Sequence, residues 1–316
     1  MKILFDSHTH INNDGYSEEE RAQLIAAIED SEVAYVMDVG FDLPSSERAV
    51  SDAALLPWCY AAVGVHPHDT KTMTEEIYEK IRCLAGRPKV QAIGEIGLDF
   101  YYNHSDAEDQ RYWFRRQIRL ANELHMPIVI HAREADQETM DILKEEGAFS
   151  EERCGWFPLR PGTGIGRKAG AQTTQKASRA GEGGRAEACE AGRAEACDCT
   201  ENCCMEKDAR VLLHCFSGSR ELAEQYVKLG ATISIAGPVT YKNNRKTSEV
   251  VSAIPIEYLL VETDAPYLTP EPHRGKKNQS PYVAYTARRV ALLKGISYEE
   301  AARRTLENAK RFYGID

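Results

Sequence analysis

The sequence lacks long apolar runs and lacks an excess of positive charge. No apolar stretch approaches the roughly 18 residues that a membrane-spanning helix needs, so we expect no membrane partner. The 39 lysines and arginines stand against 49 aspartates and glutamates, which leaves a formal net charge of −10. This balance argues against a protein that coats nucleic acid by bulk electrostatics. It does not exclude an enzyme that acts on phosphates, because bound divalent cations reverse the field locally.

The first residues also lack the apolar core of an export signal, because Asp6 interrupts the opening apolar run too early. Nine cysteines, an odd number without such a signal, favour reduced thiols over a disulfide framework. The sequence therefore predicts a cytoplasmic protein.

Short apolar runs alternate with amphipathic helical stretches along most of the chain. The runs are continuous rather than alternating, as expected for parallel strands that are covered on both sides. Eight strands followed by helices predict a single α/β domain over residues 1–316, a (β/α)8 TIM-like barrel, in preference to an open doubly wound sheet. Ser17 and Glu20 predict a capping box at the first helix. The expected strands are 2–11, 33–40, 59–67, 90–99, 127–134, 210–218, 231–237 and 258–266.

One segment, residues 148–208, interrupts this pattern between the fifth helix and the sixth strand. It is rich in Cys, Gly and Ala, has no aromatic residue after Phe157, and contains GRAEAC twice, at 184–189 and 192–197. Such a stretch cannot bury enough apolar surface to offset its ordering entropy, so we expect a disordered insertion. A helix-to-strand connection lies on the N-terminal face of a barrel, opposite the catalytic face, so the insertion should not build the active site.

The cysteines of the insertion suggest a second hypothesis. Paired thiolates can bind zinc or a softer metal, but the spacing matches no standard zinc finger. The alternative is a disordered segment with reactive thiols. The residues concerned are Cys189, Cys197, Cys199, Cys203 and Cys204.

Two histidines, His8 and His10, stand one residue apart at the end of the first predicted strand. Residues i and i+2 of a strand point to the same side, so the two imidazoles face one way. They are either a chelating pair or two core histidines with other partners. Further imidazoles and carboxylates follow other predicted strands, and such clusters are what divalent metal sites are built from. These are His66, His68, Glu95, Asp99, His131, His214, Glu262 and Asp264.

Six short motifs carry these residues along the chain. They are DSHTHI (6–11), GVHPH (64–68), GEIGLD (94–99), HARE (131–134), HCFSG (214–218) and ETDAPYLTP (262–270), the last followed by RGKKN (274–278). In their order and spacing they resemble the TatD family of metal-dependent deoxyribonucleases, over nearly the whole chain except the insertion. At the end of the last motif this sequence has Gln279 after Asn278, where the family often has Glu.

The resemblance implies a site for two divalent metal ions, Mg²⁺, Mn²⁺ or Zn²⁺. A water or hydroxide between the ions would attack phosphorus in line, and Asp264 would orient it or accept its proton. Asp264 and Glu95 are therefore the expected catalytic residues. The implied ligands are His8, His10 and Asp264 for one ion, His131 and His214 for the other, and Glu95 as the bridge between them.

Other residues are candidates for substrate contact or for orienting the ligands. Arg133 and Arg274 could bind phosphate by paired hydrogen bonds, with Lys276 and Lys277 adding positive potential, or the last three could form a merely solvated basic turn. The sequence shows no long basic groove and no aromatic stripe of the kind that binds extended single strands. The remaining candidates are His66, His68 and Asp99, any of which could instead be structural.

These observations predict a metal-dependent hydrolase of phosphodiester bonds. The family resemblance implies a 3′→5′ exodeoxyribonuclease on single-stranded DNA, or on RNA. A related metallohydrolase of an ester or amide, such as aminoacyl-tRNA, is the alternative; Glu95 stands where such enzymes often use a carboxylated lysine, which favours the phosphodiester. A non-enzymatic binding protein with the insertion as a docking tail is a third possibility, disfavoured by the complete ligand set.

Overall fold

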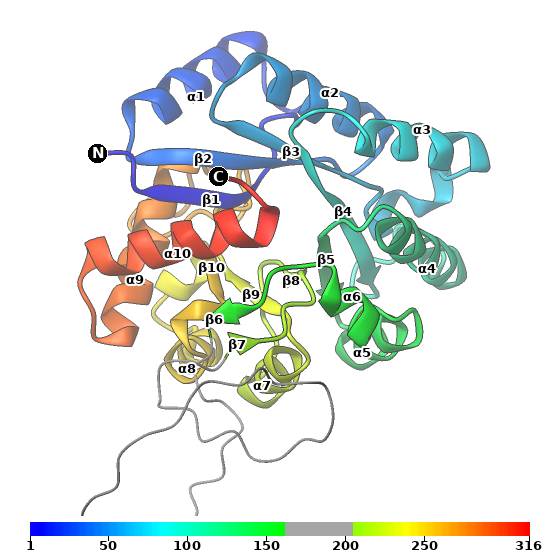
Figure 1. The fold of residues 1–316 in the computed structure, drawn as a ribbon. Helices are drawn as coiled ribbons and strands as arrows, with labels where there is room; N and C mark the ends of the chain where they lie inside the picture. The colour runs from blue at the N-terminus through cyan, green and yellow to red at the C-terminus, as the bar shows by residue number, and fades with distance from the viewer. Residues whose placement is uncertain (162–204) are drawn as a thin grey trace, which may run out of the picture.

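The computed structural model describes residues 1–161 and 205–316, and its central feature is a parallel eight-stranded barrel (Figure 1). Its strands follow the order β1-β2-β3-β4-β5-β8-β9-β10. The ring closes between its first and last strands through a parallel bridge that joins Thr9 to Ala265. The backbone N–H of His10 also donates to the carbonyl of Ala265 at 2.9 Å. The expected TIM-like barrel is confirmed.

The barrel strands are short and deeply buried, which explains why they are continuous apolar runs. They are β1 (Leu4–Thr9), β2 (Val33–Val39), β3 (Cys59–Val63), β4 (Val90–Asp99), β5 (Ile128–Arg133), β8 (Val211–Leu213), β9 (Thr232–Ile235) and β10 (Leu259–Val261). The helices are α1 (Glu18–Asp30), α2 (Leu43–Leu55), α3 (Glu75–Ala85), α4 (Ala107–Glu123), α5 (Asp136–Glu145), α6 (Glu151–Gly155), α7 (Arg220–Lys228), α8 (Arg245–Ala253), α9 (Val283–Lys294) and α10 (Tyr298–Tyr313).

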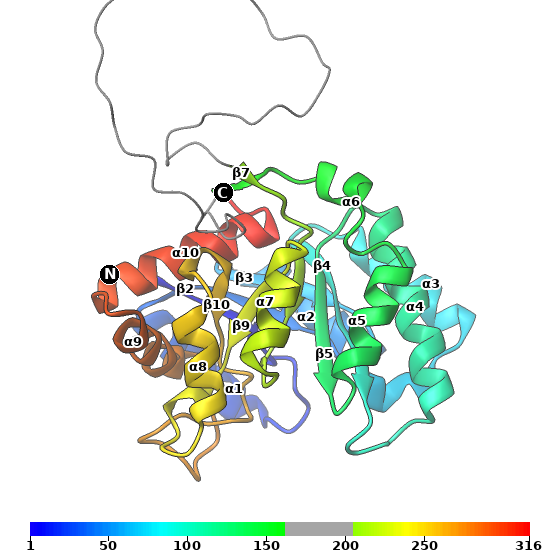
Figure 2. The same ribbon diagram turned by 90° about the horizontal axis from the view of Figure 1, so that it is seen from below.

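The C-terminal helix α10 closes the N-terminal end of the barrel. Its Phe312 and Tyr313 pack in one apolar cluster with Phe5 of β1 and with residues of the other strands. The Tyr313 hydroxyl donates to the carbonyl of Ser7 at 2.9 Å. Figure 2 shows α10 and the short strand β7 (Met205–Glu206) at the same end of the barrel. The strands finish at the opposite end, which α10 leaves uncovered.

The two ends of the insertion lie at this closed, N-terminal end. Strand β6 (Arg160–Pro161) pairs antiparallel with β7. The Arg160 guanidinium is fully buried and donates to Asp208 (2.8 Å) and to the hydroxyl of Thr232 (3.0 Å), at the start of β9. The expected range 148–208 thus includes folded flanks at both ends. The expected disorder and the five cysteines lie in 162–204, outside the described residues.

Every predicted strand except 90–99 is longer than the strand in the structure, and 59–67, 210–218 and 258–266 differ most. The expected strand 59–67 ends at Val63, so His66 lies beyond it. The expected strand 210–218 ends at Leu213, and the expected strand 258–266 ends at Val261. His214, Glu262 and Asp264 therefore lie in the loops just beyond the strands. The predicted capping box is confirmed, since the Ser17 hydroxyl accepts from the N–H of Glu20 and the Glu20 carboxylate accepts from that of Ser17. In the described ranges, no helix is both long and apolar enough to cross a membrane.

Candidate metal centre

His8 and His10 lie together at the open end of β1, as their spacing predicts. Both side chains are buried, and their Nε2 atoms are 3.3 Å apart. The Nδ1 of His10 lies 2.7 Å from the carbonyl of Val39, which fixes the proton on Nδ1. That arrangement leaves the lone pair of Nε2 free to face a cation.

Two carboxylates complete a first cluster of four donor atoms. Oε2 of Glu95, at the middle of β4, is 3.3 Å from the Nε2 of His8, and Oδ1 of Asp264 is 3.4 Å from the Nε2 of His10. All cross-distances between these imidazoles and carboxylates are 3.9 Å or less. Four ligands at about 2.0–2.2 Å from one tetrahedral ion lie roughly 3.4 Å from one another. The distances among His8, His10 and Glu95, and those from both imidazoles to Asp264, are close to this value and so fit a divalent ion.

A second cluster surrounds the other oxygen of Glu95. Oε1 lies 2.9 Å from Nδ1 of His131 and 2.8 Å from Nε2 of His214, and those two nitrogens are 3.4 Å apart. The Nε2 of His66 is 3.5 Å from the same oxygen. Glu95 thus presents one oxygen to each cluster, which is the geometry that a bridging carboxylate requires.

Asp99, the last residue of β4, holds the histidines around the second cluster. Its Oδ2 lies 3.0 Å from Nε2 of His131 and 2.9 Å from Nε2 of His68. Its Oδ1 accepts from the backbone N–H groups of Tyr101 and Tyr102, each at 3.0 Å. Asp99 and His68 therefore sit one step behind the donor atoms, where the sequence analysis expected residues that orient ligands.

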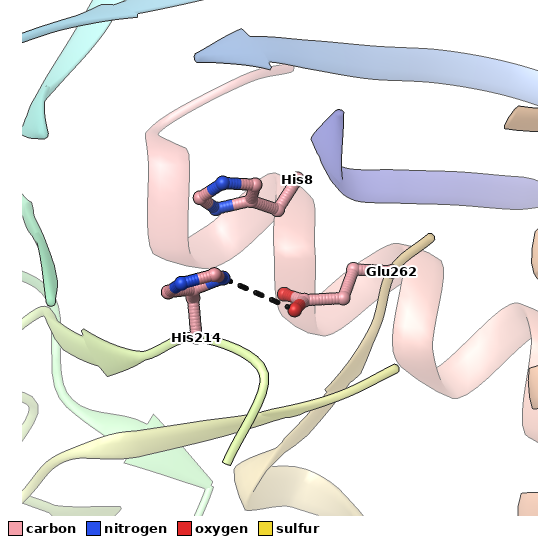
Figure 3. A group of neighbouring side chains, drawn as sticks. All are labelled: His8, His214 and Glu262. Carbon is pink, nitrogen blue, oxygen red and sulfur yellow. Dashed lines mark hydrogen bonds and ion pairs between the residues drawn. The ribbon is translucent and has the colours of Figure 1, made fainter. Parts of the chain in front are cut away.

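Glu262 contacts the ring of His214 in the way that Asp99 contacts that of His131. The sequence analysis gave Glu262 no role. Its Oε1 lies 3.3 Å from Nδ1 of His214 and accepts from the N–H of Cys215 at 2.7 Å. Figure 3 shows this pair beside His8, whose ring stacks on that of His214 at 4.0 Å. The signal was present in the sequence, because Glu262 stands two residues before Asp264 in the ETDAP motif.

The carboxylates of the centre are held in their charged form. Burial alone would raise the pKa of Glu95, but the imidazoles of His214, His66 and His131 hold that pKa well below its usual value. Burial likewise opposes ionisation of Asp264, but the hydrogen bond to His10 and the nearby His214 lower its pKa. Two anionic carboxylates among neighbouring imidazole nitrogens form a donor set that suits Zn²⁺ or Mn²⁺ and, less well, Mg²⁺.

The basic residues that the sequence analysis named as phosphate contacts differ in their distance from the donor clusters. Arg133 is exposed and its guanidinium lies over the rings of Tyr101 and Tyr102, next to the second cluster. Arg274 lies over the ring of Tyr241, 4.4 Å from its centroid, and has no described contact with the donor atoms. Lys277 is paired with Glu20 at 2.8 Å, so it is partly neutralised.

Comparison with known proteins identifies the family of the chain. A sequence profile described as "TatD related DNase" matches residues 5–154 and 189–314. The chain belongs to the TatD family. It is 36% identical to the Bacillus subtilis protein named "Uncharacterized metal-dependent hydrolase YabD", over 99% of this chain and 100% of that one. It is 28% identical to the "3'-5' ssDNA/RNA exonuclease TatD" of Erwinia tasmaniensis, over 99% and 100% of the two chains.

A solved structure of another TatD-family protein supports the fold. YjjV of Escherichia coli, described as a TatD homolog, aligns with a TM-score of 0.76 over 100% of this chain and 99% of its own, at 22% identity. The chain is thus a metal-dependent hydrolase of the TatD family, with buried clusters of histidine and glutamate that could bind metal. This finding favours the enzyme over the alternative of a non-enzymatic binding protein.

Proposed function

We propose that this TatD-family chain hydrolyses phosphodiester bonds at the 3′ end of single-stranded nucleic acid, using two divalent ions. The observation that carries the proposal is the position of Glu95, whose two oxygens each face a separate group of imidazoles at 2.8 to 3.8 Å. Two ions joined by one carboxylate suit an in-line displacement, in which both the attacking and the leaving oxygen must be stabilised.

The proposed ligands of the two ions follow from the two clusters. At this centre, divalent ions would polarise the phosphoryl group and lower the pKa of a water molecule. Glu95 contributes charge to both positions, and the remaining ligands contribute to one each. They are His8, His10 and Asp264 around one ion, and His131 and His214 around the other.

Asp264 is the residue best placed to receive the proton of the attacking water. Its side chain is 14% exposed, whereas those of His8, His10 and Glu95 are at most 5% exposed, so it is the most accessible donor of the first cluster. Its lowered pKa keeps it ionised before the reaction, as a base must be. His66, 3.5 Å from Glu95, is available as a further ligand or as a contact for the phosphate.

Positive charge in the helix layer beside the barrel supports a polyanionic substrate. A cavity of about 650 Å³ lies against α7, α8 and α9 in the helix layer. It extends from the first residues of α7 and α8, which follow the carboxyl ends of their strands, to Ala253 at the end of α8. Tyr241 lines this cavity and carries Arg274 on its ring. Four basic side chains line it against two acidic ones, in a chain whose net charge is −10. The basic residues are Arg220, Lys242, Arg245 and Arg289.

Relatives named 3'-5' ssDNA/RNA exonucleases are a second support. Those of Erwinia tasmaniensis and Klebsiella pneumoniae are each 28% identical to this chain over 99% of its length. Their names do not separate DNA from RNA, so the proposal covers single strands of both.

Cleavage of a 5′-labelled single-stranded oligonucleotide tests the proposal. With Mg²⁺ or Mn²⁺ we expect a ladder that shortens from the 3′ end and disappears with EDTA. Glu95→Gln should abolish it, whereas Glu47→Gln, at an exposed position on α2, should leave it unchanged. An intact oligonucleotide with metal-loaded protein would overturn the proposal and direct attention to esters such as aminoacyl-tRNA.

A further inference from the structure

Two exposed tyrosines stand beside the metal centre. Tyr101 and Tyr102 lie in the loop after β4, and they are 54% and 50% exposed. Their rings lie 4.8 Å apart and nearly perpendicular, at 88°. The ring of His104 is parallel to that of Tyr102, at 5.5 Å and 5°. A continuous aromatic surface is therefore open at the end of the barrel where the strands finish.

This surface is fixed relative to the donor atoms by one side chain. Asp99 accepts from the backbone N–H groups of Tyr101 and Tyr102 with Oδ1, and its Oδ2 contacts Nε2 of His131 at 3.0 Å. The other ring nitrogen of His131 faces Glu95. A chain of two side chains, the Asp99 carboxylate and the His131 imidazole, thus connects the tyrosine backbone to the proposed ion.

Arg133 adds an available cation to the aromatic surface. Its guanidinium carbon is 4.1 Å from the ring centroid of Tyr101 and 4.6 Å from that of Tyr102. Across residues 1–161 and 205–316, no carboxylate pairs with it. The stacked face of the guanidinium is occupied by the rings, but its N–H groups remain free to bind an anion, which a phosphate would supply.

We propose that Tyr101 and Tyr102 form a stacking site for an unpaired nucleobase of the substrate, with Arg133 binding the adjoining phosphate. Exposed aromatic rings next to a cation are how proteins bind single strands without reading their sequence, since every base has a π-face. The inference rests on the proposed function and makes it more specific. It assigns the preference for single strands to these residues, because a base inside a duplex must first be unstacked and unpaired.

Oligonucleotides with and without bases at the 3′ end test this proposal. The substrate pair is a single strand with normal 3′-terminal nucleotides, and the same strand with tetrahydrofuran abasic residues at those positions. For the double variant Tyr101→Ala/Tyr102→Ala we expect kcat/KM on the normal strand to fall by roughly 5- to 150-fold, the range for loss of one stacked base. The loss should lie mainly in a higher KM. On the abasic strand, the double variant should have the same kcat/KM as wild type.

Control variants separate stacking from structural damage. Tyr101→Phe/Tyr102→Phe keeps both rings and should behave as wild type. Tyr112→Ala removes a tyrosine that is also 50% exposed, but that lies on α4 and is hydrogen-bonded to Arg116. This variant should leave kcat/KM unchanged on both strands. An equal loss on both strands, or no loss on either, would overturn the proposal.

Binding, measured by fluorescence anisotropy on the same strands, keeps this test separate from that of the proposed function. If wild type cleaves neither strand, phosphodiester hydrolysis fails, but stacking is still judged by affinity. We expect wild type to bind the normal strand more tightly than the abasic one, and the alanine variant to lose that difference. Equal affinity of wild type for both strands would refute the stacking site.

Discussion

The Nε2 atom of His131 lies 3.0 Å from Oδ2 of Asp99, while Nδ1 of the same ring faces Oε1 of Glu95 at 2.9 Å. A carboxylate on one side of an imidazole fixes the proton there, so the lone pair on the other side points to the donor cluster. Burial would raise the pKa of Asp99, but the hydrogen bonds from His131 and Tyr102 outweigh it and lower that pKa. The carboxylate therefore stays ionised.

Asp99→Asn should therefore weaken metal binding without removing any proposed ligand. We expect about 10- to 100-fold lower affinity for Mn²⁺, measured by calorimetric titration, because the imidazole loses its orienting partner. Activity should recover in part at high Mn²⁺. Asp109→Asn, at an exposed position in the first turn of α4, is the matched control and should leave the affinity unchanged. An unchanged affinity in Asp99→Asn would contradict the role given to this residue.

Metal should also stabilise the fold, because the clusters form only in the folded chain. At a free Mn²⁺ concentration of 100 times its Kd, the free energy of unfolding should rise by about 2.7 kcal/mol for one site. The measurement is the urea midpoint with and without Mn²⁺. Glu95→Gln should reduce this gain and EDTA should reverse it. If Mn²⁺ stabilises wild type and Glu95→Gln equally, Glu95 is not the bridge.

Asp38 on β2 should make the metal-free protein less stable as pH rises. Burial and the neighbouring Asp52 raise the pKa of Asp38 well above 3.8. The folded chain therefore keeps a proton that the unfolded chain releases between pH 3.8 and the raised pKa. Since the folded state binds more protons in that window, the free energy of unfolding falls as pH increases through it.

Asp38→Asn should remove this slope. We expect the variant to gain stability relative to wild type as pH increases from about 4 to 7, by up to about 1.4 kcal/mol for each unit of pKa shift. Urea unfolding in EDTA at several pH values gives the difference, and a constant difference across the series would contradict the prediction. The groups that face Asp38 or its partner are Asn12, His10, Arg21, Asp52 and Cys59.

The buried pair at the base of the insertion should matter for stability. Arg160 and Asp208 are both fully buried, with their atoms 2.8 Å apart. Arg160→Met would leave the carboxylate with Arg311, at 3.2 Å, as its remaining ion pair, and should cost about 3 kcal/mol. Arg303→Met breaks an exposed pair with Glu307 and should cost less than about 1 kcal/mol. Equal losses in chemical denaturation would refute the buried pair's contribution.

Much of the fold could be predicted from the sequence. Each buried parallel strand is a continuous apolar run, and the two-residue period places His8 and His10 on one side. The ends of the last strands could not be predicted, because the residues after Leu213 and Val261 combine single backbone hydrogen bonds to the neighbouring strands with side-chain contacts. The N–H of His214 still donates to Ile130, at 3.0 Å. The Oε1 of Glu262, for example, accepts from the N–H of Cys215.

Register and buried charge account for what the sequence analysis missed. Asp99 pairs with Arg133 across β4 and β5, and this register brings the arginine beside Tyr101. Tyr101, Tyr102 and His104 lie close together in the sequence, but the sequence does not show that β5 brings Arg133 onto their rings. The folded flanks of the range 148–208 could not be predicted for a related reason. A charged residue such as Arg160 is rarely buried without a partner, and its partner Asp208 lies at the other end of that range.

The number of Mn²⁺ ions held by the chain tests the central claim most directly. Mn²⁺ prefers oxygen and nitrogen donors, so the cysteines of 162–204 interfere less than they would with Zn²⁺. Electron paramagnetic resonance of the loaded protein should show two ions per chain with the spectrum of a coupled pair. In Glu95→Gln the coupling should be lost, and in Glu47→Gln it should persist. One uncoupled ion per chain in wild type at saturation would contradict a two-metal centre bridged by Glu95.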